Sequence, residues 1–233
     1  MQEVAEFRMP KIVLYGRNSL EKLGGQASKL GRKAFIISDF IMGKLGYIDV
    51  CIEQLKANKI EVVTYNNVNA EPTNVHVSEA LRICREEKCD VIIGLGGGSC
   101  IDAAKAVAVL ATNGGKIEDY VQNYVSIKRE SLPLIAIPTT SGTGSEVTSV
   151  TVITNKKTDV KMMIKHPNFI PQVAIIDPEL TRSVPSHITA ATGIDALCHA
   201  INGGLYFSIF TTAYRCACTF SDEKYYEVFA HCL

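Results

Sequence analysis

Glycine is concentrated at residues 94–99, which read Gly-Leu-Gly-Gly-Gly-Ser between an apolar run and a helical pattern. Glycines lack a Cβ, so successive backbone N–H groups can approach an anion. The N-terminus of the following helix adds unpaired donors and the positive end of its dipole. We therefore predict a diphosphate-binding loop. The alternative is a glycine-rich turn that binds nothing, with Asp102 stabilising the helix end.

A second loop, residues 138–146, sets threonine and serine hydroxyls beside two glycines at the end of an apolar run. Each hydroxyl both donates and accepts, so the loop suits a ribose, a phosphate or a carboxamide. Ligands of open α/β sheets bind at the carboxyl ends of the strands. A surface turn is the alternative, because these residue types are common in turns. Two such loops at one sheet edge favour ligand binding.

Asp39 ends another apolar run, residues 34–38. A carboxylate at this position can accept hydrogen bonds from the ribose diol of NAD, and it would repel the additional phosphate of NADP. The sequence therefore predicts NAD, with NADP disfavoured. Asp39 as an ordinary residue at the start of a loop remains the alternative.

Asp195 and His199 are four residues apart in a helical pattern, so both side chains project from one helix face. Together they can bind one divalent cation, or they can form a hydrogen bond on the helix surface. A transition metal takes three or four protein ligands, so the pair would be half of such a site.

The order of sequence patterns predicts an α/β fold, a Rossmann-like parallel sheet with helices on both faces, because short β-branched runs alternate with longer amphipathic ones. The expected strands are Lys11–Tyr15, Ala34–Ser38, Glu61–Tyr65, Asp90–Gly94, Leu134–Pro138 and Val173–Asp177. The expected helices are Ser19–Leu30, Asn74–Glu87 and Cys100–Ala111, and a hairpin is expected from Val147–Asn155 and Val160–Ile164.

The β-type alternation ends after residue 181, and Ser186 is the expected N-cap of a new helical unit. We therefore divide the chain into an α/β domain, residues 1–185, and the start of a helical domain, residues 186–233. Residues 188–201 are rich in Ala and Leu, which is typical of a buried helix.

The composition excludes several functions. The chain has 233 residues with 24 Lys+Arg and 24 Asp+Glu, and its net charge of zero offers no field for nucleic acid or an anionic membrane. No run reaches the ~18–20 apolar residues of a membrane span, and the first residues lack a secretory pattern. We expect a cytoplasmic protein whose eight cysteines are thiols.

Four motifs resemble those of the iron-containing alcohol dehydrogenases, and the resemblance extends from Pro10 to about Ile201. They are Gly-Gly-Gly-Ser-x-x-Asp-x-x-Lys at 96–105, Pro-Thr-Thr-x-Gly-Thr-Gly-Ser-Glu at 138–146, Asp-Pro-Glu-Leu-Thr at 177–181 and Thr-Gly-Ile-Asp-Ala-Leu-Cys-His-Ala at 192–200. The family implies an N-terminal dinucleotide-binding domain and a C-terminal helical, metal-binding domain, with the active site between them.

The resemblance also implies roles for individual residues. Asp39 would contact the adenosine ribose, and the diphosphate would meet Gly97, Gly98 and Ser99. The nicotinamide side would be lined by Thr139, Thr140, Ser145 and Thr148, with Lys161 and Leu180 also near the cofactor. Asp195 and His199 match two of four ligands for Fe(II) or Zn(II). Glu71 stands where many relatives carry Asn.

The function implied is a metal-dependent alcohol dehydrogenase, which transfers a hydride between a small alcohol or aldehyde and NAD(P). In this family the metal polarises the alcohol oxygen. A non-catalytic dinucleotide-binding remnant is the main alternative. A glycerol dehydrogenase or dehydroquinate synthase relative is a third reading, which the motifs at 138–146 and 177–181 disfavour. Family members often dimerise through the N-terminal domain, so a homodimer is also implied.

After Ile201 the chain departs from the family pattern and ends at Leu233. One choice of codons for residues 215–230 encodes a family-like helical segment in the next reading frame. We therefore expect a frameshift near residues 201–204, with 202–233 as out-of-frame translation. Such a truncated chain would keep two metal ligands and an uncovered apolar helix, which predicts self-association and weak or absent catalysis.

Overall fold

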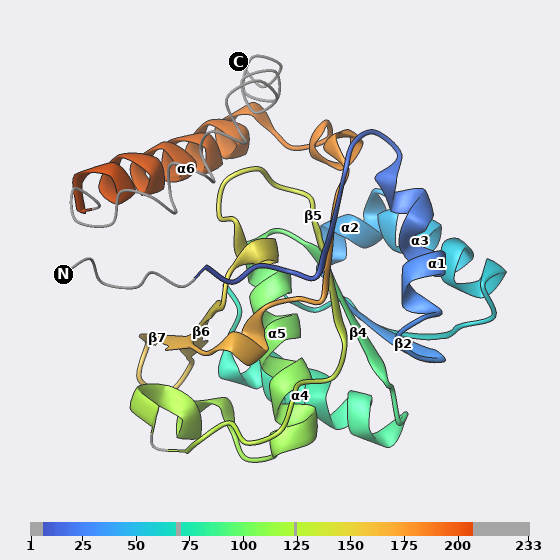
Figure 1. The fold of residues 1–233 in the computed structure, drawn as a ribbon, viewed down its shortest axis with the longest axis horizontal. Coiled ribbons are helices and arrows are strands. Elements are labelled where there is room, and N and C mark those ends of the chain that lie inside the picture. Colours follow the sequence, from blue (N-terminus) through green and yellow to red (C-terminus); the bar gives the residue numbers. More distant parts are fainter. Residues whose placement is uncertain (1–6, 69–70, 124, 207–233) are drawn as a thin grey trace.

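A six-stranded parallel sheet forms the centre of the protein (Figure 1). The computed structural model describes residues 7–68, 71–123 and 125–206. The strand order is β1-β8-β5-β4-β2-β3, and every neighbouring pair is parallel. The strands are β1 (Ile12–Tyr15), β2 (Lys33–Ile37), β3 (Glu61–Tyr65), β4 (Val91–Gly96), β5 (Leu134–Pro138) and β8 (Val173–Ile176). The predicted parallel sheet is confirmed, with strand ends shifted by at most two residues.

Helices cover both faces of the sheet, as the alternating pattern predicts (Figure 1). Successive residues of β2 face opposite sides. Ala34 and Ile36 pack in one buried cluster, and Phe35 and Ile37 pack in the other. The first cluster lies against α1 (Leu23–Ala27), α2 (Phe40–Lys44) and α3 (Tyr47–Ala57), and the second lies against α4 (Asn74–Glu86) and α5 (Gly98–Asn113).

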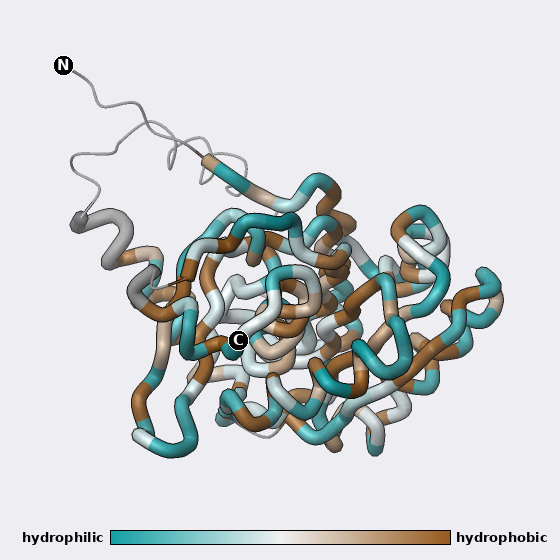
Figure 2. Tube along the Cα trace, turned by 90° about the horizontal axis from the view of Figure 1, so that it is seen from below, coloured by the Kyte–Doolittle hydropathy of each residue, from teal (hydrophilic) through white to brown (hydrophobic). Residues whose placement is uncertain are grey.

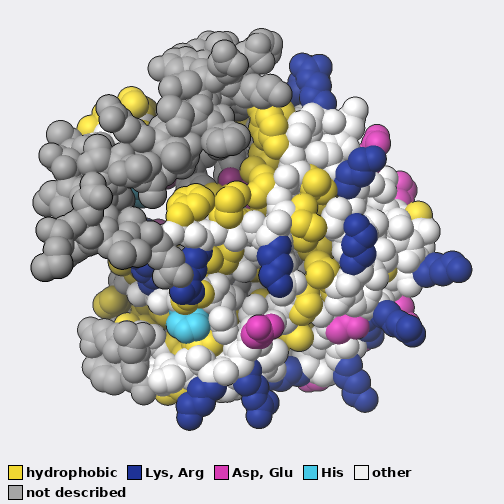
Figure 3. All heavy atoms as spheres, viewed as in Figure 1, with side chains coloured by type: hydrophobic (Ala, Val, Ile, Leu, Met, Phe, Trp, Pro, Cys, Tyr) yellow, Lys and Arg dark blue, Asp and Glu magenta, His cyan; other side chains and the backbone are white. Residues whose placement is uncertain are grey.

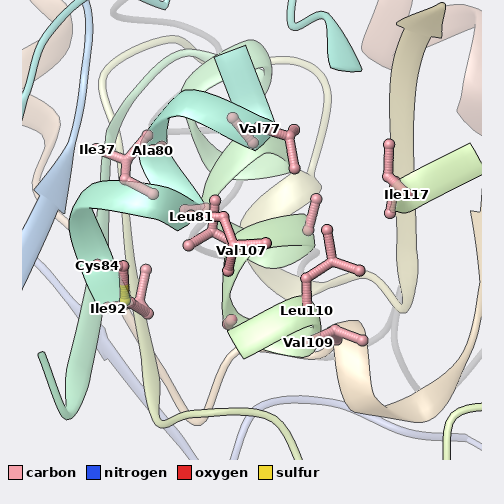
Figure 4. Packing of buried hydrophobic residues seen from close by; sticks show 14 of the residues in the cluster. Ile37, Val77, Ala80, Leu81, Cys84, Ile92, Val107, Val109, Leu110 and Ile117 are labelled. Atoms are coloured by element: carbon pink, nitrogen blue, oxygen red, sulfur yellow. The ribbon is translucent and has the colours of Figure 1, made fainter. Parts of the chain in front are cut away.

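The cluster beneath α4 and α5 is built from buried residues of both helices and from one face of the sheet. Figure 4 shows side chains from α4 and α5 meeting Ile37 of β2 and Ile92 of β4. The predicted hairpin, β6 (Val150–Asn155) and β7 (Val160–Lys165), packs on the same side through Ile153 and Ile164. Along the chain, hydrophobic stretches alternate with hydrophilic bends (Figure 2).

Several boundaries differ from the sequence expectation. The hairpin begins at Val150, because Val147 closes a short 3-10 turn, Ser145–Val147, by donating from its N–H to the carbonyl of Gly144. Residues 19–30 divide into a 3-10 turn, Ser19–Lys22, and the short α1. The helices α2 and α3 were not expected. Further 3-10 turns are Ile117–Asn123, Pro167–Phe169 and Pro178–Thr181.

The last described helix, α6 (Ser186–Tyr206), lies at the edge of the molecule (Figure 1). Ser186, which was expected to be the N-cap, is instead the first residue of the helix. The apolar side chains of Ile194, Leu197 and Ile201 are 61%, 55% and 51% exposed, so the expected uncovered apolar surface is present. Residues 207–233 of the expected out-of-frame tail lie outside the described residues. Among the helices that are described, none has the length and apolar character needed to cross a bilayer.

Candidate functional site

The candidate site lies at the carboxyl edge of the sheet, where the strand order reverses between β2 and β4. From β2 the chain continues outward to β3, whereas β4 lies on the opposite side of β2. Open α/β sheets bind ligands at such a switch point. The segments that leave this edge carry Asp39 after β2, Gly97 after β4 and Thr139 after β5. The fold therefore brings together three segments that the sequence singled out separately.

The glycine loop turns directly into α5. Gly96 has a φ of +140°, a backbone conformation that L side chains rarely adopt. Gly97 is the extended N-cap, and Gly98 already belongs to the helix. This start is two residues earlier than expected, so Asp102 lies beyond the first helical turn. The helix N-terminus is therefore aimed at the edge of the sheet, where its N–H groups and dipole favour an anion.

The glycine and threonine loops pack directly against each other. The N–H of Thr139 donates to the carbonyl of Gly96 at 3.0 Å. A Cβ added at Gly98 would lie 2.9 Å from Oγ1 of Thr143, and one added at Gly97 would lie 3.5 Å from Oγ1 of Thr140. A side chain at position 98 would therefore displace the side chain of Thr143.

Asp39 lies beside the first turn of α5. One of its carboxylate oxygens caps α2 by accepting from the N–H of Met42 at 2.9 Å. The other accepts from the thiol of Cys100 at 3.5 Å. Asp39 therefore begins a loop and helix, as the ordinary interpretation holds, and it also borders the glycine loop, as the ribose interpretation requires.

A buried polar network connects α5 to residues 145–152, and the sequence analysis did not predict it. Lys105 is fully buried. Its ammonium donates to the carbonyl of Thr148 at 2.9 Å, to the hydroxyl of Thr148 at 3.1 Å and to the carbonyl of Val150 at 2.7 Å. These contacts hold the segment that follows the threonine loop.

Asp102, one helical turn before Lys105 on α5, forms hydrogen bonds to the same segment, residues 145–152. Its carboxylate accepts from the hydroxyl of Ser145, and from the N–H of Val152 at 2.9 Å. Its backbone carbonyl accepts from the hydroxyl of Thr151 at 2.9 Å. The idea that Asp102 stabilises the end of α5 is therefore wrong, because its carboxylate bonds to the neighbouring segment. The available signal was a charged pair, Asp102 and Lys105, in an otherwise uncharged helix.

Burial dominates the electrostatics of this network. It lowers the pKa of Lys105 from 10.5 to about 8, although Asp102 and Glu146 act in the opposite direction. Burial also raises the pKa of Asp102, against the effects of Lys105 and its hydrogen-bond donors, and it raises the pKa of Glu146. The network is therefore maintained by its hydrogen bonds at a cost in charge burial.

The threonine loop also contacts α6. A Cβ added at Gly142 would lie 2.4 Å from the carbonyl oxygen of Thr192. Asp195 follows Thr192 by three residues and therefore lies on the same side of the helix. The fold thus places the predicted metal pair near the threonine loop.

Asp195 and His199 lie close together, with Oδ1 of Asp195 3.6 Å from Nε2 of His199. Both side chains are exposed. Within the described part of the chain, no group of three or more His, Cys, Asp or Glu side chains is arranged to bind a metal ion. A transition metal takes three or four protein ligands, so these two side chains by themselves do not complete such a site.

Lys161 and Leu180 are the two remaining residues expected to lie near the cofactor. Lys161 is on β7, where its ammonium pairs with the Glu71 carboxylate at 2.8 Å. Leu180 is buried in the hydrophobic cluster on the α1 and α3 side of the sheet.

The parallel sheet, the switch point and the two packed loops define a Rossmann-like α/β protein. The iron-containing alcohol dehydrogenase family matches residues 10–178, and the chain belongs to that family. The chain is similar to the NAD-dependent methanol dehydrogenase of Bacillus methanolicus, with 36% identity over 199 residues, which cover 85% of this chain and 52% of that protein.

Solved structures show the same relationship. The crystal structure of 1,3-propanediol oxidoreductase has a TM-score of 0.81 at 34% identity, covering 85% of this chain and 52% of that one. Sulfoacetaldehyde reductase from Bifidobacterium kashiwanohense, in complex with NAD+, has a TM-score of 0.79 at 33% identity, covering 86% and 53%. The chain spans about half the length of the relatives it matches.

Proposed function

We propose that this chain is the cofactor-binding part of a metal-dependent alcohol dehydrogenase, which transfers a hydride between a small alcohol or aldehyde and NAD(P). The observation that supports the proposal most is the close packing of Gly98 against Thr143, because it places a helix N-terminus and a row of hydroxyls at one switch point. When NAD is bound there, its nicotinamide supplies the hydride acceptor or donor.

The residues divide into three groups along such a cofactor. Gly97, Gly98 and Ser99 would hold the diphosphate at the N-terminus of α5. The nicotinamide side would be lined by Thr139, Thr140, Ser145 and Thr148, with Lys161 and Leu180 completing the set. Asp102 and Lys105 already bond to Ser145 and Thr148. Their role would be to fix those hydroxyls before the cofactor arrives, which reduces the ordering cost of binding.

Asp39 would select NAD over NADP. Its carboxylate already borders the first turn of α5 through Cys100. A ribose diol can donate to a carboxylate there, whereas a ribose phosphate would bring a second negative charge against it. Electrostatic repulsion then disfavours NADP.

The remainder of the assignment concerns α6 and the whole molecule. We propose that residues 1–185 form the cofactor domain and that residues 186–233 begin the helical domain, in which Asp195 and His199 would contribute to an Fe(II) or Zn(II) site.

Exposed apolar side chains of the edge strand β1, Ile12 and Tyr15, support a homodimer. Figure 3 shows hydrophobic side chains gathered over the middle of that view. The free state of all five described cysteines suits the cytoplasm.

A non-catalytic dinucleotide-binding protein is the second candidate. Such a protein would use the same glycine and threonine loops for the cofactor and would need no more metal ligands than Asp195 and His199, the pair that lies close together among the described residues.

Titration with NADH, monitored by cofactor fluorescence, tests the shared part of both candidates, and alcohol oxidation with and without added Fe(II) or Zn(II) separates them. Binding with metal-dependent turnover is expected for the dehydrogenase. Binding without turnover selects the second candidate. The absence of binding to folded protein at millimolar NADH contradicts both.

A further inference from the structure

The turn that ends α4 brings two cysteines together. Lys88 has a φ of +53°, the left-handed conformation that ends many helices. The N–H of Cys89 donates to the carbonyl of Cys84 at 3.0 Å, and the N–H of Lys88 donates to the carbonyl of Arg85 at 3.2 Å. These two bonds define a Schellman motif, which characteristically holds the side chains at the positions of Cys84 and Cys89 in contact. In most proteins that contact joins two apolar residues.

Both side chains belong to the same buried hydrophobic cluster, as this turn geometry leads us to expect. Cys84 projects from α4 into the core beside Ile92 (Figure 4). Cys89 lies at the border of the same cluster. The residue is 7% exposed to solvent, compared with 2% for Cys84. Cys89 is therefore the sulfur that a small reagent reaches first when the last turn of α4 opens.

The pKa values of the two thiols also differ, and they too favour Cys89 as the more reactive thiol. Interaction with the Cys84 thiol lowers the pKa of Cys89, and the nearby Lys33 ammonium lowers it as well. Burial and the carboxylates of Glu87 and Asp90 act in the opposite direction, and the pKa remains lowered. Interaction with Cys89 and burial raise the pKa of Cys84. Cys89 is therefore the attacking thiolate and Cys84 the resolving thiol.

We propose that Cys84 and Cys89 form a thiol-disulfide pair that is oxidised by low-molecular-weight disulfides such as oxidised glutathione. The Cys89 thiolate attacks one sulfur of the reagent, forms a mixed disulfide and releases one glutathione thiolate. Cys84 then loses its proton and attacks the sulfur of Cys89, which forms the intramolecular S–S bond and releases the second glutathione. The protein loses two electrons and two protons, and one oxidised glutathione becomes two reduced molecules.

The other buried cysteines lack these features. Burial raises the pKa of Cys51 to about 12 and raises that of Cys100 well above its usual value. The proposed disulfide also lies away from the candidate cofactor site, because Cys89 precedes β4 and the glycine loop follows it. The modification is therefore independent of the proposed dehydrogenase function.

Peptide mapping of the full chain tests the proposal. The protein is equilibrated with glutathione buffers of increasing oxidised fraction, quenched with acid, alkylated in denaturant and digested with trypsin. Cleavage after Arg85 and Lys88 separates the two cysteines, so the disulfide joins peptide 83–85 to peptide 89–105. Peptide 89–105 also contains Cys100, and fragmentation of the linked pair assigns the bond. We expect the Cys84–Cys89 link to exceed half of the protein in the most oxidised buffer and to disappear with dithiothreitol.

The variants provide the controls. Cys51→Ser is expected to leave the yield of linked peptide unchanged, whereas Cys89→Ser is expected to abolish it. Complete alkylation of both cysteines in wild-type protein at every buffer ratio would overturn the proposal without recourse to a variant. A link from Cys84 to Cys100, or a link that persists in Cys89→Ser, would overturn it as well.

Discussion

Replacing Lys105 with methionine tests whether α5 organises the segment that follows the threonine loop. Methionine has a similar length and no hydrogen-bond donor, so Lys105→Met removes three bonds, to both oxygens of Thr148 and to the carbonyl of Val150. Each buried acceptor left unpaired costs about 1–3 kcal/mol. Removal of a buried ammonium offsets part of that loss. We expect a net destabilisation of about 1–3 kcal/mol at pH 7.

The pH dependence provides a sharper signature. Because burial lowers the pKa of Lys105 from 10.5 to about 8, the unfolded chain binds more protons than the folded one between those values. The free energy of unfolding therefore rises with pH from about 8 to 10.5, by up to about 3 kcal/mol, and the gain is lost as pH falls through 8. Lys105→Met lacks this contribution, so the gap between wild type and variant widens towards alkaline pH.

Urea unfolding followed by far-UV circular dichroism is a suitable assay, because the chain contains no tryptophan. Lys157→Met is the matched control, since Lys157 is exposed in the turn between β6 and β7 and should leave both the stability and its pH dependence unchanged. If Lys105→Met unfolds within about 0.5 kcal/mol of wild type at pH 7, and the two pH curves run parallel, the buried network does not have the energetic role argued for it.

Three further changes address the site and α6. Gly98→Ala places a Cβ 2.9 Å from Oγ1 of Thr143, so NADH affinity measured by fluorescence should fall about tenfold or more, while Gly25→Ala, where nothing lies within 4 Å, should not change it. Asp39→Asn keeps the cap of α2 and removes the charge, so the ratio of NADPH to NADH affinity should rise, and an unchanged ratio would exclude Asp39 as the selector. Ile194→Glu introduces charge on the exposed face of α6 and should reduce self-association in analytical ultracentrifugation; equal association would place the contact elsewhere.

Much of the sheet could be predicted from local patterns. The strands β4 and β5 are buried along their whole length, and such strands read as continuous apolar runs. Parallel strands share one carboxyl edge, so the convergence of Asp39, the glycine loop and the threonine loop followed from strand assignment alone. The helix α2 escaped prediction because it has five residues and contains Gly43, which leaves a run too short for a clear helical period. The eleven-residue α3 was also missed, although its buried residues Ile48, Cys51 and Leu55 recur at helical spacing.

Other features of the site depend on tertiary packing. Lys105 and Val150 are 45 residues apart, and Asp102 and Val152 are 50 apart. No local pattern indicates that the hairpin would lie across α5 and offer its backbone to those side chains. The pairing of Gly142 with Thr192 likewise depends on where α6 meets the loop.

The sequence by itself determined the fold class, the family and the edge of the sheet at which the loops meet, because periodicity and motif spacing are encoded over short stretches. Only the tertiary structure decided which polar groups are buried, what they bond to and which apolar face of α6 stays exposed. Burial and hydrogen-bond partners are properties of surfaces that meet across long sequence separations, so they arise only when the elements pack.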